Sequence, residues 1–234
     1  MVNYSPALEI YSRTMAPMNF EQTRFNMVEQ QIRPWDVLDQ DVLNLLYAVP
    51  REEFVPPEYK GIAFTDMEIP IGDGERMMPP KMEARILQEL SVRKSDRVLE
   101  VGTGSGYLTA LLAHRAAHVL SVEIQPKLAE FGRKNLSRHG VDNLTLQAGD
   151  ASHGIPAHAP YDVIVLTGST PVLPTDILGQ LARGGRLFAI VGEAPIMVAR
   201  LYSCGATGGY RSVELFDTVI APLKNAERAS RFEF

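Results

Sequence analysis

The sequence predicts an α/β domain with a mostly parallel, doubly wound sheet, an antiparallel hairpin at one edge of that sheet, and a helical N-terminal extension. Three observations lead to this prediction. Strand-like and helix-like segments alternate from Asp96 onward, a glycine-rich turn follows the first of these strands, and two strand-like segments flank a glycine-containing turn in the last part of the chain. The 234 residues, 45% of them hydrophobic, are enough to bury a large core.

The composition excludes several classes of function. A net charge of −5 and a pI of about 5.6 provide no basic field that would recruit nucleic acid or anionic lipid. The single cysteine, Cys204, excludes an intramolecular disulfide and a Cys-rich zinc site, and fits a reducing compartment. No apolar run approaches the ~20 residues of a membrane helix, and the first twenty residues do not resemble a secretory signal. We therefore expect a cytoplasmic protein that uses no metal, nucleic acid or membrane.

The pattern divides the chain into an N-terminal arm over residues 1–17, which we expect to be disordered, and a single domain over residues 18–234. Within that domain the pattern changes near residue 95. Residues 18–94 are predicted to form helices and loops, and residues 95–234 the α/β core.

The N-terminal helices follow from apolar spacing and from proline positions. Apolar residues recur at helical spacing from Phe20 to Leu46, and Pro34 divides them into two helices. The prolines and glycines between residues 50 and 80 predict loops and short strands, and residues 81–90 are predicted to be a further helix.

The core elements follow from the alternation of short apolar runs with helical segments. Predicted strands cover 97–101, 118–123, 144–148, 162–166 and 186–191, and predicted helices cover 107–117, 125–138 and 176–181. We interpret 144–148 and 162–166 as buried strands. Residues 196–202 and 210–216 are predicted to form the antiparallel hairpin, and 218–221 to continue it or add a strand.

The most informative segment is the glycine turn after the first core strand. It reads Glu100-Val101-Gly102-Thr103-Gly104-Ser105-Gly106, followed by Tyr107. A dinucleotide fingerprint would require glycine at position 107, and an acid at position 100 would repel a pyrophosphate. The same acid suits a cationic ligand, such as one that carries an ammonium or a sulfonium group.

Two further acidic residues follow the next two strands. Glu123 ends the second core strand, where a carboxylate can accept hydrogen bonds from both ribose hydroxyls, and Asp150 follows the third, where an acceptor can meet an adenine amino group. Taken singly, the turn can be a tight connection, Glu123 a solvated strand end and Asp150 a helix cap. In this order at successive strand ends, they resemble the S-adenosylmethionine-dependent methyltransferases of the Rossmann-like class.

Competing chemistries lack their motifs. Thr103 and Tyr107 occupy positions that a hydrolase nucleophile elbow around Ser105 would need as glycine, and no phosphate-binding G-x-x-x-x-G-K-[S/T] loop is present. His153 and His158 lack a third metal ligand at useful spacing and are interpreted as solvated loop residues.

The resemblance extends to one family. The runs Asn26–Ile32, Val49-Pro50-Arg51-Glu52-Glu53-Phe54-Val55-Pro56, Ile69–Gly74, Ala159–Thr167 and Leu181–Leu187 resemble the protein-L-isoaspartate (D-aspartate) O-methyltransferases, over residues 20 to 223. The resemblance implies a Rossmann-like methyltransferase with S-adenosyl-L-methionine as cofactor, which repairs isoaspartyl residues in damaged protein or peptide. The implied cofactor-binding residues are Glu100, Gly102, Thr103, Gly104, Ser105, Gly106, Glu123, Ile124, Asp150 and Ala151. Residues 18–94 then carry the acceptor side and 95–234 the cofactor-binding core.

The acceptor segment departs from the family pattern. The family has a Thr-Ile-Ser segment whose serine lies beside the acceptor carboxylate, and this sequence has Arg76 at the threonine and Met78 at the serine. Asp73 stands between the two glycines, where the family usually has histidine. We predict Met78, Arg76 and Thr167 as the residues around the reacting groups, with Ser169 as a further group that orients the acceptor. Because a thioether cannot donate a hydrogen bond, a methyltransferase with another acceptor and a cofactor-binding module without turnover remain alternatives.

Overall fold

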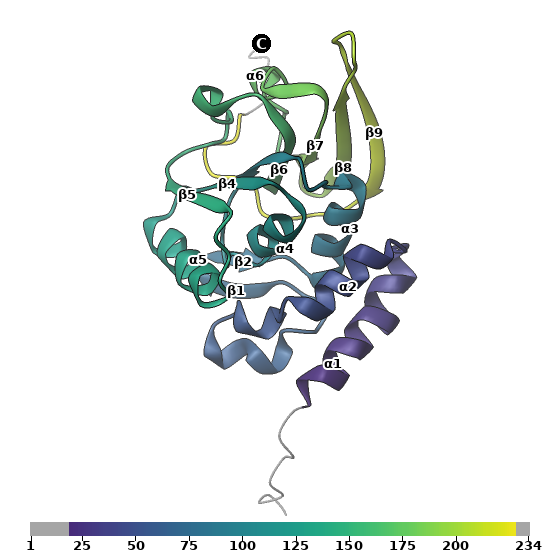
Figure 1. Cartoon of the computed structure of the whole chain (residues 1–234), viewed down its shortest axis with the longest axis vertical. Coiled ribbons are helices and arrows are strands. Elements are labelled where there is room, and N and C mark those ends of the chain that lie inside the picture. Colours follow the sequence, from purple (N-terminus) through teal and green to yellow (C-terminus); the bar gives the residue numbers. More distant parts are fainter. Residues whose placement is uncertain (1–18, 228–234) are drawn as a thin grey trace, which may run out of the picture.

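A computed structural model describes residues 19–227, so the predicted arm over residues 1–17 lies outside the described residues. Seven strands form one sheet in the order β5-β4-β3-β6-β7-β8-β9, and the first five of them in that order are parallel (Figure 1). The strands are β3 (Arg97–Val101), β4 (His118–Glu123), β5 (Leu144–Ala148), β6 (Tyr161–Thr170), β7 (Leu181–Glu193), β8 (Ile196–Cys204) and β9 (Tyr210–Asp217). The antiparallel pairs β7–β8 and β8–β9 confirm the predicted hairpin at one edge.

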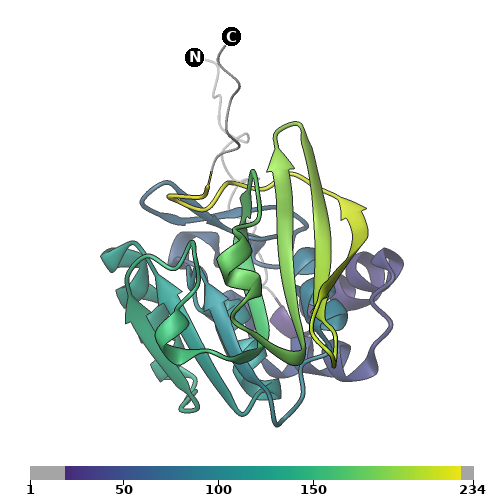
Figure 2. The same ribbon diagram turned by 90° about the horizontal axis from the view of Figure 1, so that it is seen from above.

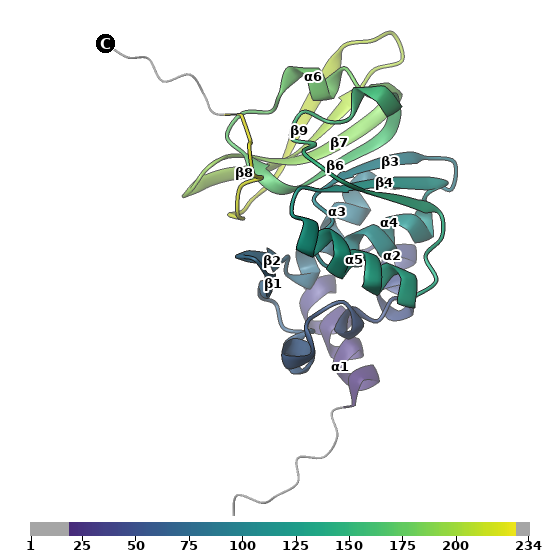
Figure 3. The same cartoon turned by 90° about the vertical axis from the view of Figure 1, so that its left-hand side faces the viewer.

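Helices cover the two faces of this sheet unequally. Among residues 19–227, α3 (Pro80–Leu90), α4 (Tyr107–Arg115) and α5 (Pro126–Arg138) lie on one face, and α6 (Thr175–Leu178), a 3-10 turn over Pro156–His158 and loops lie on the other (Figures 2 and 3). Each face has its own cluster of buried apolar side chains. Because side chains alternate along a strand, Val98 belongs to the cluster under the helices and Leu99 to the opposite one.

The N-terminal extension packs beneath the helical face. Its first helix, α1 (Phe20–Met27), continues into a π turn over Val28–Ile32 and a 3-10 turn over Arg33–Trp35, where Pro34 ends it as predicted. The second helix, α2 (Gln40–Ala48), begins after Asp39, whose side chain accepts hydrogen bonds from the backbone N–H groups of Asp41 and Val42 in the first turn. Within residues 19–227, no helix is long and apolar enough to cross a membrane.

The loop-rich stretch ends in a small hairpin that we call the acceptor hairpin, formed by β1 (Ile69–Gly72) and β2 (Glu75–Met77) and continued by Met78. Arg51, the first residue of the 3-10 turn Arg51–Glu53, holds this hairpin from inside the core; a second 3-10 turn, Pro57–Ile62, follows. Its fully buried guanidinium donates to the carbonyl oxygens of Ala63 (2.8 Å) and Met78 (2.5 Å) and forms an ion pair with Glu83 of α3. The backbone at Met78 is therefore fixed relative to α3.

Five sequence predictions differ from the structure. Strands β6 and β7 are longer than predicted, and α6 is shorter. Residues 144–148 were interpreted as a buried strand, but β5 is the edge strand, and its side chains are only partly buried because it pairs with β4 alone. Residues 218–221 add no strand to the sheet. They begin a segment, residues 218–227, that we call the strap and that crosses the carboxyl edge of the sheet (Figure 2).

Candidate functional site

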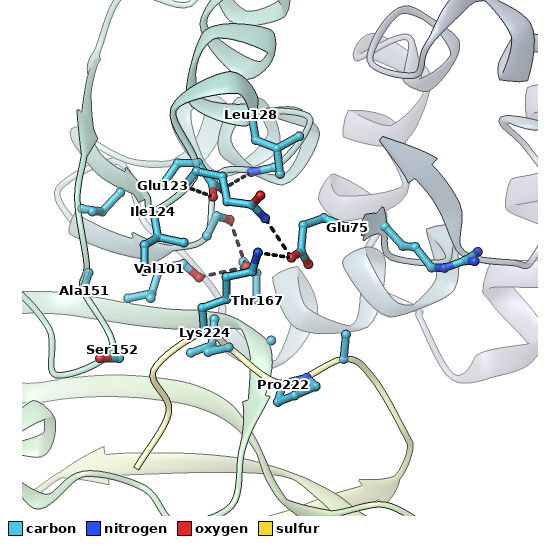
Figure 4. Close-up of a pocket in the computed structure, with 18 of the residues that line it drawn as sticks. Glu75, Val101, Glu123, Ile124, Leu128, Ala151, Ser152, Thr167, Pro222 and Lys224 are labelled. Atoms are coloured by element: carbon cyan, nitrogen blue, oxygen red, sulfur yellow. Dashed lines mark hydrogen bonds and ion pairs between the residues drawn. The ribbon is translucent and has the colours of Figure 1, made fainter. Parts of the chain in front are cut away.

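A pocket lies at the carboxyl edge of the sheet, next to the point where the strand order reverses between β3 and β6. The glycine turn, the ends of β4, β5 and β6, the acceptor hairpin and the strap line it (Figure 4). Ligands of open α/β sheets bind at this kind of switch point, since the loops after neighbouring strands diverge there. The pocket thus lies between the α/β core and the N-terminal part of the chain.

The glycine turn brings backbone to the wall of the pocket. Gly102 has φ +98°, and a Cβ at this position would lie 2.1 Å from the Oγ1 atom of Thr167. The Thr167 hydroxyl donates to the carbonyl oxygens of Val101 and Gly102, at 2.8 and 2.9 Å, as a shared hydrogen bond. Because only glycine permits this close packing and this φ, the turn and Thr167 form one rigid surface.

Glu123 lies at the end of β4 with a nearly buried carboxylate that lines the pocket. One oxygen accepts from the backbone N–H of Gly104 (2.9 Å) and the other from that of Gln125 (3.0 Å). Each carboxylate oxygen can accept a second hydrogen bond, so both remain able to accept one from a hydroxyl in the pocket. The neighbouring Ile124 supplies an apolar part of the same wall.

Asp150, after β5, lines the far part of the pocket together with Ala151. Its carboxylate accepts from the backbone N–H of Ser152 (2.9 Å) and from the side-chain amide of Asn225 (2.8 Å). Partial burial acts to raise the pKa of Asp150, but these hydrogen bonds outweigh burial and hold the pKa below its ordinary value. The carboxylate is therefore ionised and oriented.

The structure does not bring every predicted residue to the pocket. Glu100 does not line it, because its fully buried side chain points toward α4, where one oxygen accepts from Thr109 and from Ser121 (2.6 Å). Its other oxygen has no hydrogen-bond partner among residues 19–227, and burial raises the pKa of Glu100 to about 8. Glu100 therefore lies behind the pocket wall, and its predicted role toward a cationic ligand stays a prediction.

Three turn residues also lie behind the pocket wall. The hydroxyl of Thr103 makes a hydrogen bond with that of Ser121 (2.6 Å), and the carbonyl oxygen of Ser105 accepts from Asn135 (2.9 Å). Gly106 precedes α4 and packs against Leu136, where a Cβ would meet the Cγ atom at 3.0 Å. These residues shape the turn, and only Gly102 and Gly104 of its glycines line the pocket.

Comparison with known proteins agrees with this geometry. A sequence profile of the protein-L-isoaspartate(D-aspartate) O-methyltransferase family (PCMT) matches residues 22–216. The chain belongs to this family. It is 45% identical to the protein-L-isoaspartate O-methyltransferase of Methanoculleus marisnigri over 169 residues (72% of this chain and 77% of the relative), and 36% identical to that of Aeropyrum pernix over 208 residues (87% and 80%).

Solved structures of PCMT proteins share the fold. One protein-L-isoaspartate O-methyltransferase is 25% identical, with a TM-score of 0.69 over 88% of this chain and 66% of the other. A Plasmodium falciparum structure described as a PCMT in complex with S-adenosyl-L-homocysteine has a TM-score of 0.72 at 23% identity, over 89% and 99% of the two chains. The second likeness shows that the Rossmann-like methyltransferase fold extends over nearly the whole chain.

Within this PCMT fold, the acceptor hairpin brings Met78 and Arg76 to the wall of the pocket. The Met78 side chain is 8% exposed, and Arg76 is exposed and makes no ion pair within residues 19–227. Ser169 was predicted to orient the acceptor, but it is fully buried inside β6, and its hydroxyl donates to the carbonyl oxygen of Ile220 (3.2 Å). It therefore holds the strap and does not face the pocket.

The sequence analysis missed Glu75, Gln125 and Lys224, which all line the pocket of this PCMT protein. Glu75 extends from the acceptor hairpin into the pocket, toward Lys224 of the strap (Figure 4). The Glu75 Oε1 atom accepts from the side-chain amide of Gln125 (2.8 Å) and lies 3.2 Å from the Lys224 Nζ atom. No motif predicts this contact, since it joins three separate segments of the chain.

Proposed function

We propose that this protein transfers the methyl group of S-adenosyl-L-methionine to the side-chain carboxylate of isoaspartyl residues in damaged protein or peptide. Membership of the PCMT family supports this reaction. The observation that carries it is the pocket at the strand-order reversal, with Glu123 and Asp150 at successive strand ends beside the glycine turn. An enzyme with another acceptor, or a module without turnover, is not favoured by the family comparisons.

The residues of the pocket fit the cofactor. Glu123 would accept hydrogen bonds from the two ribose hydroxyls, and Asp150 from the adenine amino group, with Ile124 and Ala151 as apolar contacts. Gly102 and Gly104 present backbone to the part of the pocket where the rest of the cofactor would lie, and a side chain at either position would crowd Thr167 or Ile71 and strain the turn.

Methyl transfer depends more on the alignment of the reacting groups than on proton transfer. When bound, the cofactor supplies a methyl group on a cationic sulfur. The acceptor carboxylate is already ionised at neutral pH, so the chain needs no general base. Alignment of the reacting groups in one pocket can contribute roughly 7–11 kcal/mol to lowering the barrier. The rigid surface of Gly102 and Thr167 provides a fixed reference for that alignment.

The acceptor side would bind the carboxylate through charge. Arg76, which lines the pocket and has no ion-pair partner among residues 19–227, would form charge-assisted hydrogen bonds to it. Met78 would pack against the acceptor and exclude water from that side of the pocket. We propose that the protein acts in the cytoplasm, in keeping with its single cysteine. We also propose that residues 18–234 form one domain.

A radiolabelled methyl assay tests the proposal directly. We expect the wild-type protein to methylate a peptide with one isoaspartyl residue and to leave unmodified the otherwise identical peptide with an ordinary aspartyl residue. Isothermal titration with S-adenosylmethionine provides the second measurement. Cofactor binding without methylation of the isoaspartyl peptide would contradict the proposed acceptor, and absence of binding would contradict the assignment of the cofactor pocket.

A substitution at position 78 tests the acceptor side. Because methionine cannot donate the hydrogen bond of the family's serine, we expect Met78→Ser to raise the rate constant for isoaspartyl methylation, by up to ~10²–10³-fold if the hydroxyl stabilises mainly the transition state. Cofactor affinity should stay within about two-fold. The control is Met67→Ser, because Met67 is 45% exposed and lies outside the pocket. A natural protein as active as a serine-bearing relative would contradict this reasoning.

A further inference from the structure

The strap closes one side of the cofactor pocket. Backbone hydrogen bonds fix its first part to β6: the N–H of Ser169 donates to Ala221 (3.0 Å), and the N–H of Leu223 donates to Ser169 (2.8 Å). A Cβ on Gly168 would lie 3.0 Å from the backbone nitrogen of Leu223, so strap and strand are in close contact. Residues 220–224 then form a wall of the pocket.

The last part of the strap is held differently, by two side chains. Asn225 donates to Asp150 on the α/β core (2.8 Å), and Lys224 forms an ion pair with Glu75 of the acceptor hairpin (3.2 Å). The same Glu75 oxygen accepts from Gln125, two residues after Glu123 (2.8 Å). One carboxylate therefore joins the acceptor hairpin, the start of α5 and the strap.

This ion pair is only partly shielded from water. The side chain of Lys224 is 47% exposed and that of Glu75 is 31% exposed. Pairs with this exposure contribute little free energy and are screened by salt, so the contact can break and re-form readily. By contrast, the backbone hydrogen bonds at Ser169 are buried and leave the first part of the strap in place.

We propose that Glu75 is a positioning residue that holds the end of the strap and the acceptor hairpin together across the cofactor pocket, and that breaking its contact with Lys224 opens the pocket for exchange of the cofactor product. The proposal rests on the proposed function, because each turnover then requires S-adenosylhomocysteine to leave. Closure of this contact places the acceptor hairpin, with Met78 and Arg76, against the occupied pocket. The same pair thus links retention of the cofactor with binding of the acceptor.

The experiment measures the dissociation rate of S-adenosylhomocysteine by stopped-flow displacement, together with the KM for an isoaspartyl peptide. Glu75→Gln removes the charge but keeps an acceptor for Gln125, and Lys224→Met keeps most of the apolar stem. We expect each variant to release the product about two- to five-fold faster, the range for a partly exposed ion pair, and to raise the acceptor KM. The double variant should be no faster than either single one.

Three controls separate this positioning role from a general loss of structure. Lys127→Met removes the Lys127–Asp73 pair (3.3 Å), which joins the same hairpin to the same helix outside the pocket, and should change neither quantity. The exchanged pair Glu75→Lys with Lys224→Glu should restore slow release. Added NaCl should accelerate release from the wild type more than from Lys224→Met.

The outcomes are distinct for the two proposals. Product release at the wild-type rate from both single variants would overturn the role of Glu75 while leaving the proposed function intact. An equal effect of Lys127→Met would also overturn it, since any ion pair between the hairpin and its surroundings, and not this contact, would then set the rate. A wild-type protein that does not bind S-adenosylhomocysteine would overturn both proposals.

Discussion

Glu100 offers a sharp test of the buried electrostatics behind the glycine turn. Its carboxyl is fully buried between β3, β4 and α4, with one oxygen hydrogen-bonded by Thr109 and Ser121 and the other without a partner among residues 19–227. Burial raises its pKa from 4.5 to about 8. We therefore expect this group to carry a proton at neutral pH in the folded protein and to lose that proton on unfolding.

The sign and size of the effect follow from this difference. Between pH 4.5 and pH 8 the folded state holds a proton at Glu100 that the unfolded state has released, so the free energy of unfolding falls as pH rises. With about 1.4 kcal/mol per pKa unit, the contribution lost across this range is about 5 kcal/mol. Glu100→Gln keeps a neutral side chain of the same shape and should abolish this dependence.

The assay is urea denaturation of the wild type and of Glu100→Gln at intervals between pH 5 and pH 9. We expect the variant to be less stable at pH 5, where its amide nitrogen lacks a partner, and the more stable of the two at pH 9. Glu83, whose pKa burial raises to about 7 beside Arg51, contributes to both proteins and cancels in their difference. Parallel stability curves would refute the assignment of a protonated Glu100. A large loss of cofactor affinity would refute its placement outside the pocket.

Two further predictions follow from the same structure. Glu123→Ala should weaken S-adenosylmethionine binding by roughly 1.5–3 kcal/mol, because it removes a charged acceptor for the ribose hydroxyls, and unchanged affinity by isothermal titration would show that the ribose lies elsewhere. Arg51→Met should lower the free energy of unfolding by about 3–5 kcal/mol, because it leaves the buried Glu83 side chain without its charged hydrogen-bond partner, and adding Glu83→Leu should recover part of that loss in urea denaturation.

The sequence predicted best those elements whose local pattern agrees with their tertiary environment. Strands β3, β4 and β5 have the predicted bounds, because short apolar runs between helices specify a parallel sheet. The burial of β5 was predicted wrongly, since a pattern of residues does not show which strand lies at the edge. The extension of β6 to Thr170 was not predicted either, because its last residues pair with β7 across a register shift and contact the strap.

The cofactor side of the pocket was predictable for Glu123 and Asp150, whose strand ends place them at the carboxyl edge. Glu100 lies away from the pocket wall because its neighbours Leu99 and Val101 face one side of the sheet, and alternation places Glu100 on the other side, under α4. The polar residues Thr109 and Ser121 could have indicated that Glu100 is buried, because a buried carboxyl needs hydrogen-bond partners of this kind. The sequence gives no indication of the contact between Glu75 and Lys224, since only the folded chain brings these residues together.

The acceptor side of the pocket differs from the cofactor side because backbone hydrogen bonds fix its position. Arg51 donates to the carbonyl oxygen of Met78, and this hydrogen bond does not depend on the side chain at position 78. Since Arg51 is itself fixed by Ala63 and Glu83, we expect the hairpin to keep its place when residue 78 or the exposed residue 76 is substituted. We therefore expect Met78, which stands where the family resemblance implies a serine, to alter the group presented to the acceptor without changing the geometry of the cofactor side of the pocket. For this reason Met78→Ser should affect the rate of methyl transfer far more than cofactor binding or stability.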